Sequence, residues 1–200
     1  MSESNPLLTI SLLSSGRSET IERCLSSFDQ IREKIETEVI IVDTDPGHRE
    51  DVQEILRRYA DQIIPFEWCD DFSAARNAGL KEAKGRWFMF IDDDEWFFDV
   101  TPVADFIKSP VSDKQEWANY QTRNYLNEDF SKYTDAWATR LVKLNKRRRF
   151  IGKVHEYITG IDGSPYLVDA MVGHTGYIFK TDEEKSKHDE RNISLLQKAM

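Results

Sequence analysis

Short apolar runs alternate with amphipathic segments through the first half of the chain, and this pattern restricts the possible folds more than any other feature. The runs cover residues 7–13, 38–42, 61–66 and 87–91. Several are rich in β-branched residues, as is usual for strands buried in a parallel sheet. Between them, helices are predicted over residues 18–28, 49–59 and 70–83. We therefore predict an α/β fold, a mostly parallel sheet with helices on both faces.

Polar loops follow three of the predicted strands, at residues 14–17, 43–45 and 92–95. Ser18, just after the first loop, is the predicted N-cap of the following helix. Because parallel sheets bind ligands beyond the carboxyl ends of their strands, we expect the three loops to border one crevice for phosphate or nucleotide groups. The first loop lacks both the glycine spacing of a dinucleotide site and the lysine of a P-loop.

Four consecutive carboxylates, Asp92, Asp93, Asp94 and Glu95, come directly after the apolar run at residues 87–91. Adjacent like charges repel one another, and burial at a strand end raises the cost. A bound Mg²⁺ or Mn²⁺ offsets that cost, since such ions take oxygen ligands and keep positions that substrate phosphates fill. The alternative is a solvated acidic turn in which Glu95 begins the next helix. The convergence of the three loops favours the metal site.

Charge and cysteine usage restrict the possible partners. A net charge of −9 argues against nucleic acid, because binding its phosphate backbone needs a basic face. The basic cluster at Lys143 and residues 146–149 is local, and it fits either a solvated turn or a site for one anion. Cys24 and Cys69 lack the spacing of a zinc site, so we expect buried, reduced thiols.

Neither a secretory signal nor a membrane span is visible. Residues 1–6 carry no positive segment followed by an apolar run. The longest apolar runs are about five residues, far below the ~20 that a membrane helix needs. We therefore expect a cytoplasmic protein without a transmembrane segment, which leaves peripheral association with a membrane open.

The second half of the chain predicts shorter strands. Residues 117–125 are expected to pair with residues 139–144 across a polar turn. Further extended segments are predicted at residues 150–158 and 166–172. Residues 181–200 are polar and helical, and we expect a helix that is truncated at the last residue.

Several short motifs together resemble family 2 glycosyltransferases of the GT-A fold, in particular the bacterial branch whose catalytic domain can precede helical repeats. The motifs are Val42-Asp43, Asp71-Phe72-Ser73-Ala74-Ala75-Arg76-Asn77, Gly85-x-Trp87 leading into Ile91-Asp92-Asp93-Asp94-Glu95, Gly152-Lys153-Val154-His155-Glu156, and His174-x-Gly176-Tyr177. The resemblance implies a Rossmann-like catalytic domain at residues 1–180, divided into a nucleotide-sugar half (1–100) and a smaller, mixed β acceptor half (101–180). Residues 181–200 would be a C-terminal helix.

The activity implied is transfer of a sugar from a nucleoside diphosphate sugar, with a UDP-sugar as first choice, to an acceptor hydroxyl or thiol. The resemblance implies an inverting reaction and a divalent cofactor, Mn²⁺ or Mg²⁺. The acceptor could be a peptide, a polysaccharide or a lipid-linked sugar. Two other functions are compatible with the sequence: a catalytically degenerate domain that serves as a scaffold, and a sugar-phosphate nucleotidyltransferase. Against the nucleotidyltransferase, the sequence has no glycine-rich phosphate loop near the first strand.

The resemblance assigns nucleotide binding to residues of the first half. Ser14 and Arg17 would line the nucleotide pocket, and Asp43 would meet the base. Arg76 would contact the base or the diphosphate, whereas the residues alone favour a charge on a helix surface. The loops at residues 14–17 and 44–48 depart from the family pattern, which weakens the inference about the base and the ribose.

The carboxylate loop is assigned to the metal and the donor. Asp92 would lie near the ribose or the metal, and Asp94 would be a direct metal ligand that acts in catalysis. Asp93 belongs to the same donor-binding loop and, with Glu95, is expected to orient it. His174 would approach the metal or the diphosphate, and a hydrogen-bonded core histidine is the alternative.

An inverting transfer needs a general base on the acceptor side. Glu156 is the candidate, with Asp169 and Asp135 as weaker ones. The alternative for Glu156 is a structural pair with Lys153 or Arg140. His155 is expected to shape the site beside the donor sugar.

Overall fold

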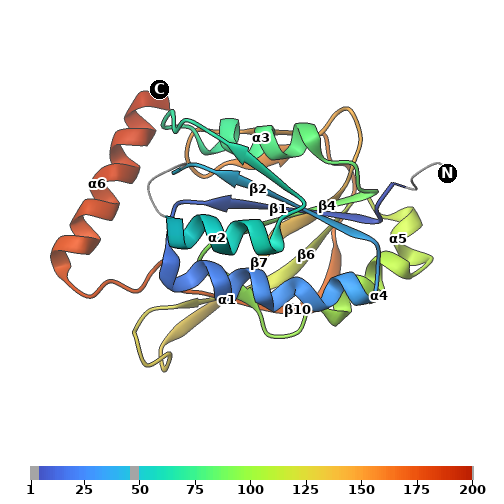
Figure 1. Ribbon diagram of the computed structural model, residues 1–200, viewed down its shortest axis with the longest axis horizontal. Helices are drawn as coiled ribbons and strands as arrows, with labels where there is room; N and C mark the ends of the chain where they lie inside the picture. The colour runs from blue at the N-terminus through green and yellow to red at the C-terminus, as the bar shows by residue number, and fades with distance from the viewer. Residues whose placement is uncertain (1–4, 46–49, 200) are drawn as a thin grey trace.

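The computed structural model describes residues 5–45 and 50–199, and within them the chain forms one large sheet flanked by helices (Figure 1). Across these residues the sheet has eight strands in the order β3-β2-β1-β4-β7-β6-β10-β5. They are β1 (Leu8–Ser14), β2 (Thr37–Asp43), β3 (Gln62–Pro65), β4 (Trp87–Asp92), β5 (Glu95–Phe97), β6 (Trp117–Tyr125), β7 (Tyr133–Lys143) and β10 (Tyr166–His174). A separate antiparallel ribbon consists of β8 (Arg149–Ile151) and β9 (Tyr157–Thr159). The helices are α1 (Ser18–Asp29), the 3₁₀ helix η1 (Gln30–Glu33), α2 (Glu50–Tyr59), α3 (Phe72–Glu82), α4 (Thr101–Lys108), α5 (Val111–Lys114) and α6 (Asp182–Ala199).

The strands β3, β2, β1 and β4 run parallel, and their register brings the predicted loops together. β1 pairs with β2 and β4, so Ser14 lies opposite Asp43 and Leu13 lies opposite Asp92. β7 joins β4 in the antiparallel sense, and the strands of the second half extend the same sheet. Figure 1 shows α1 and α2 on one face of the sheet and α3 on the other. The predicted α/β fold is confirmed.

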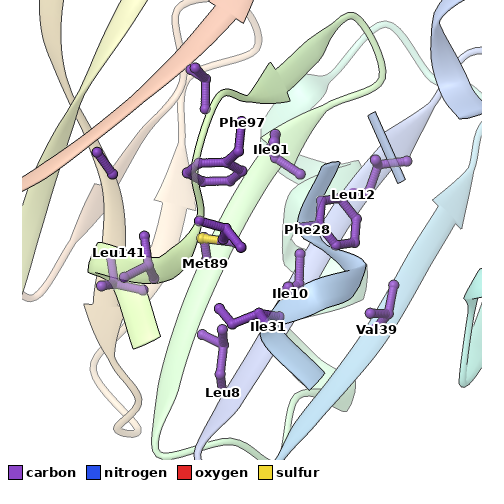
Figure 2. Packing of buried hydrophobic residues seen from close by; sticks show 14 of the residues in the cluster. Leu8, Ile10, Leu12, Phe28, Ile31, Val39, Met89, Ile91, Phe97 and Leu141 are labelled. Carbon is purple, nitrogen blue, oxygen red and sulfur yellow. The ribbon is translucent and has the colours of Figure 1, made fainter. Parts of the chain in front are cut away.

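Alternate residues of β1 face different helices, as expected for a strand that is buried on both sides. Leu8, Ile10 and Leu12 pack under α1 and η1 in the main hydrophobic core (Figure 2). On the other face, Ser11 lies against Gly79 of α3, where an added Cβ would stand 2.3 Å from the Ser11 Oγ. The absence of a side chain at Gly79 therefore lets α3 approach the sheet closely.

Three local predictions differ from the structure. Arg17 takes the N-cap position of α1 in place of Ser18, and the Arg17 side chain makes no capping hydrogen bond. β7 begins at Tyr133, well before the predicted start at residue 139, because its first half is exposed and lacks the apolar alternation that identifies a strand. Glu95 begins β5 and not a helix. The second-strand loop at residues 46–48 and the predicted helix start at Arg49 lie outside the described residues.

The basic cluster and the cysteines have structural explanations. Arg148 is 6% exposed and donates hydrogen bonds to the Lys143 carbonyl and the Glu116 carboxylate, so part of the cluster holds the chain in place. Cys24 is buried as predicted, but Cys69 is exposed because it lies in the loop before α3. In the described part of the chain, we find no helix with the length and apolar character needed to cross a bilayer.

Candidate active site

A cavity of about 740 Å³ opens at the carboxyl ends of β1 and β4, and nearly all of the predicted site residues line it. These are Ser14, Arg17, Arg76, Asp92, Asp93, Asp94, His155, Glu156 and His174. Asp43 is outside the lining: it is 1% exposed and accepts hydrogen bonds from the Gln53 side chain at 2.5 Å and the Asp45 amide at 3.1 Å. Its neighbour Thr44 borders the cavity in its place.

The loop after β1 is fastened to the loop after β4. The amide and hydroxyl of Ser15 donate hydrogen bonds to Asp93 Oδ2 at 2.7 and 2.9 Å. Asp93 is only 3% exposed, and burial raises its pKa to about 6 although Arg17 opposes the shift. Asp93 thus holds two loops together, as expected of a residue that orients the carboxylate loop.

Asp94 lies between a cation and an imidazole. Arg17 forms a short ion pair with Asp94 and a second one with Asp93 Oδ1 at 3.3 Å. His174 Nε2 lies 3.5 Å from Asp94 Oδ1, while its Nδ1 is 2.7 Å from the Asn124 side-chain oxygen. The contact with Asn124 fixes the ring so that Nε2 faces Asp94. His174 is therefore hydrogen-bonded to the protein and also lines the cavity, and its approach to a metal or diphosphate stays a prediction.

Asp92 is held by two arginines from different elements. Arg76 of α3 binds Asp92 Oδ1 at 2.6 Å, and Arg140 of β7 lies 3.3 Å from Asp92 Oδ2. Burial would raise the pKa of Asp92, but the two guanidinium groups outweigh burial and hold that pKa well below its usual range. The carboxylate is therefore charged and directed at protein cations.

Glu95 is the most deeply placed member of the carboxylate run. It is 1% exposed, pairs with Arg140 at 2.6 Å and accepts a hydrogen bond from the Asp92 amide at 3.1 Å. Burial raises its pKa to about 7, against the opposing effect of Arg140. The solvated acidic turn is excluded, because Asp93, Asp94 and Glu95 are all buried.

Arg76 connects Asp92 at the end of β4 to Glu156. It is 4% exposed, so it is not the surface charge that its helical position alone would favour. Its Nε donates a hydrogen bond to Glu156 Oε1 at 2.9 Å. Arg76 is thus an ion-pair partner of Glu156, whereas the sequence suggested Lys153 or Arg140 for a structural pair. Its Nη1 is buried and has no hydrogen-bond partner within the described residues. One edge of this guanidinium is therefore unsatisfied.

Glu156 also borders a second cavity of about 440 Å³. Its walls are largely apolar and include Phe90, Trp117, Tyr157 and Ile158. The two cavities share only Arg76, Asp92 and Glu156, so these residues form the wall between them. Glu156 is thus accessible from both sides.

The other acidic candidates lie elsewhere. Asp135 pairs with Arg123 at 2.8 Å on the β6–β7 hairpin, and Asp169 is exposed on β10. Neither borders either of these two cavities. His155, by contrast, lines the main cavity and has a left-handed backbone with φ of 54°. A non-glycine residue in that region costs energy and is held by its surroundings.

The donor set suits a cation that shares its ligands with a substrate. Asp94 and His174 offer an oxygen and a nitrogen in one place, but Asp92 is directed at arginines. The described residues contain no group of three or more histidine, cysteine or acidic side chains placed to bind one metal ion. Mg²⁺ and Mn²⁺ commonly take one or two protein ligands and complete their shell with phosphates and water. The residues fit such an ion once Arg17 releases Asp94.

Sequence reasoning missed a large part of the cavity wall. Ser15 and Thr44 line it as part of the loops at residues 14–17 and 43–45, which were expected to border the crevice. Residues of α6 carried no signal, because a polar helix is typical of a solvated surface. Lining residues outside the predicted loops and motifs include Thr20, Trp68, His188, Asp189, Arg191 and Asn192.

Comparison with known proteins agrees with the motifs. The chain is 26% identical to the SPbeta prophage-derived glycosyltransferase SunS of Bacillus subtilis, over 98% of this chain and 45% of SunS. It is 31% identical to a TPR repeat-containing protein of Synechococcus elongatus over 44% of this chain and 20% of that protein. The chain thus spans less than half the length of these two relatives.

Among solved structures, the TarS fragment 1–349 of S. aureus in complex with UDP-GlcNAc matches with a TM-score of 0.45 and 21% identity, over 61% of this chain and 35% of that one. The model of glycosyl transferase family 2 matches residues 15–161, which is well over half of the chain. The chain belongs to glycosyl transferase family 2.

Proposed function

We propose that this protein transfers a sugar from a nucleoside diphosphate sugar, with UDP-sugars to be tested first, to an acceptor hydroxyl or thiol, with inversion at the anomeric carbon. The observation that carries the proposal is the unsatisfied Nη1 of Arg76 in the wall of the main cavity. A buried guanidinium nitrogen without a partner is costly, and an oxygen of a phosphate or sugar would satisfy it. The hydroxyl of Thr20, also in the wall, likewise has no hydrogen-bond partner among residues 5–45 and 50–199.

The size and composition of the cavity support a nucleotide sugar. A volume of about 740 Å³ lies within the roughly 300–1,000 Å³ usual for small-molecule sites. Trp68 and Phe72, whose ring centroids are 4.8 Å apart, give its wall an aromatic part. Arg17 and Arg76 give it a part suited to anions.

Asp94 and His174 would hold the divalent ion, and the ion would neutralise the charge that accumulates on the departing diphosphate. Arg17 pairs with Asp94 in this structure and would turn to the phosphates as the donor binds. Asp92 would keep its arginine partners and so position Arg76. We assign Asp92 to the support of the site and not to direct metal binding.

Glu156 would act as the general base from the wall between the two cavities. The acceptor would enter the second cavity, whose aromatic walls suit a sugar ring or an apolar side chain. In one displacement, the acceptor oxygen or sulfur bonds to the anomeric carbon while the carbon–oxygen bond to the diphosphate breaks. The acceptor proton passes to Glu156, and the diphosphate leaves with the bonding electrons. Arg76 holds Glu156 in place for this transfer.

The proposal is tested by calorimetry and by donor hydrolysis with the full-length protein. We expect UDP to bind in the presence of Mn²⁺, and UDP-sugars to be hydrolysed slowly in the absence of an acceptor. Asp94→Asn should abolish hydrolysis, and Asp105→Asn, on the exposed face of α4, should leave it unchanged. Failure of UDP, GDP and their sugars to bind would refute a nucleotide-sugar enzyme. Binding that is unaffected by Asp94→Asn, without any hydrolysis, would instead support the scaffold function.

Glu156→Gln separates catalysis from binding. The amide keeps the shape of the side chain but cannot accept the acceptor proton, so turnover should fall by about 10²–10⁴-fold. UDP affinity should change by less than about threefold, because glutamine can still accept the hydrogen bond from Arg76 Nε and so keep Arg76 in position. A variant with normal turnover would exclude Glu156 as the base.

A further inference from the structure

Helix α6 forms one wall of the main cavity, although it comes last in the chain and outside the residues that match the family. Figure 1 shows α6 beside the edge of the sheet toward which β1 and β2 point. His188, Arg191 and Asn192 line the cavity, and Leu195 of the same helix is 2% exposed. The spacing i, i+3, i+4 and i+7 places these four side chains on one helix face. One face of α6 is therefore directed at the cavity and anchored by Leu195.

The cations of the cavity differ in what they already bind. Arg17 pairs with Asp93 and Asp94, and Arg76 pairs with Asp92 and Glu156. Arg191 makes no ion pair with a described carboxylate, and its guanidinium contacts only the Asn192 side-chain oxygen at 3.3 and 3.4 Å. Its charge is available to a ligand without the loss of an existing ion pair.

Arg191 also lines the same cavity as Arg17 and Asp94, the residues that would meet a diphosphate and its cation. Partial burial lowers its pKa, the Arg17 charge lowers it further, and the Asp94 charge raises it. These influences place Arg191 within electrostatic range of both residues. Arg17 and Arg191 repel each other across the cavity that both line, and an anion held between them would remove that repulsion.

We propose that Arg191 binds the terminal phosphate of the nucleotide diphosphate, so that α6 is part of the donor site. This inference rests on the proposed function and extends it to a residue beyond the matched region. A phosphate between Arg17 and Arg191 accepts charge-assisted hydrogen bonds from both guanidinium groups. The phosphate also replaces Asp94 as the anionic partner of Arg17, so that Asp94 becomes free to bind the cation. The helix would therefore help to release the metal ligand as the donor binds.

The test is titration calorimetry of the full-length protein with UDP, uridine and inorganic pyrophosphate, each with Mn²⁺. Arg191→Gln should weaken UDP and pyrophosphate binding by a factor of about 10–100, the usual cost of a charge-assisted contact, and leave uridine binding unchanged. Lys187→Ala is the matched control: Lys187 is on the same helix, is 71% exposed and pairs with Glu183. The Lys187→Ala variant should bind all three probes with the affinities of the wild type. Arg191→Lys should restore part of the loss.

The outcomes separate this inference from the proposed function. Equal UDP and pyrophosphate affinities for Arg191→Gln and wild type would overturn the role of Arg191 and leave the donor site intact. Equal losses for uridine and UDP would overturn it as well, since they would show that the substitution disturbs α6 as a whole. If wild type binds pyrophosphate through Arg191 but not UDP, the uridine donor is wrong and the phosphate contact stands. Absence of both UDP and pyrophosphate binding to wild type would overturn both proposals.

Discussion

Replacing Arg140 by methionine should destabilise the protein strongly, because this arginine compensates a deeply buried carboxylate. Arg140 pairs with Glu95 at 2.6 Å and lies 3.3 Å from Asp92, and its own side chain is 14% exposed. Methionine fills much of the same space but leaves Glu95, which is 1% exposed, next to Asp92 and Asp94 without a cation. Removal of one partner from a buried ion pair typically costs about 3–5 kcal/mol.

The magnitude can be converted into a measurable shift. For a chain of about this size, 1 kcal/mol corresponds to roughly 2–4 °C in the melting temperature. A loss of about 3–5 kcal/mol therefore predicts a decrease of roughly 6–20 °C. Urea denaturation followed by circular dichroism gives the free energy of unfolding directly, and the m-value checks that wild type and Arg140→Met unfold in the same way.

A double-mutant cycle shows whether charge is the cause. Glu95→Gln in the Arg140→Met background removes the uncompensated charge, so the double variant should recover about 2 kcal/mol or more relative to Arg140→Met alone. Additive losses would refute the reasoning and assign the effect to packing. Arg123→Met is the control: Arg123 is also on the β6–β7 hairpin and pairs with Asp135 at 2.8 Å, but both side chains are partly exposed. It should cost about 1 kcal/mol or less.

Two further substitutions test His174 as a metal ligand and the hydrogen bonds that join α3 to β8. Gly176→Ala places a Cβ 2.4 Å from His174 Nε2, so the imidazole should turn away from Asp94. Mn²⁺ affinity in the presence of UDP, followed by electron paramagnetic resonance, should fall about 10–100-fold, and unchanged affinity would exclude His174 as a ligand. Asn77→Ala removes two 2.9 Å hydrogen bonds that join α3 to the backbone of Phe150 in β8. Unfolding should become easier by about 1–3 kcal/mol, whereas a loss below about 0.5 kcal/mol would mean that water satisfies both groups.

The sequence by itself determined the parallel half of the sheet and the position of the site along the chain. The runs that became β1, β2 and β4 are apolar on both faces, as is typical of strands that helices cover on both sides. Since parallel strands end at one edge of a sheet, Ser14, Asp43 and Asp92 were bound to lie near one another. The motifs of the second half identified Glu156 and His174, which line the same cavity.

The partners of each charge were decided only by the tertiary structure. Whether Arg76 is exposed or buried depends on Glu156, which is distant in the chain, and on the close approach that Gly79 permits. Asp43 follows its strand as predicted, but Gln53 of α2 engages its carboxylate away from the cavity. The packing position of α6 could not be predicted either, because a polar helix has no apolar periodicity that specifies its neighbour. Strand and helix formation follow local patterns, whereas ion pairs depend on distances between residues far apart in the chain.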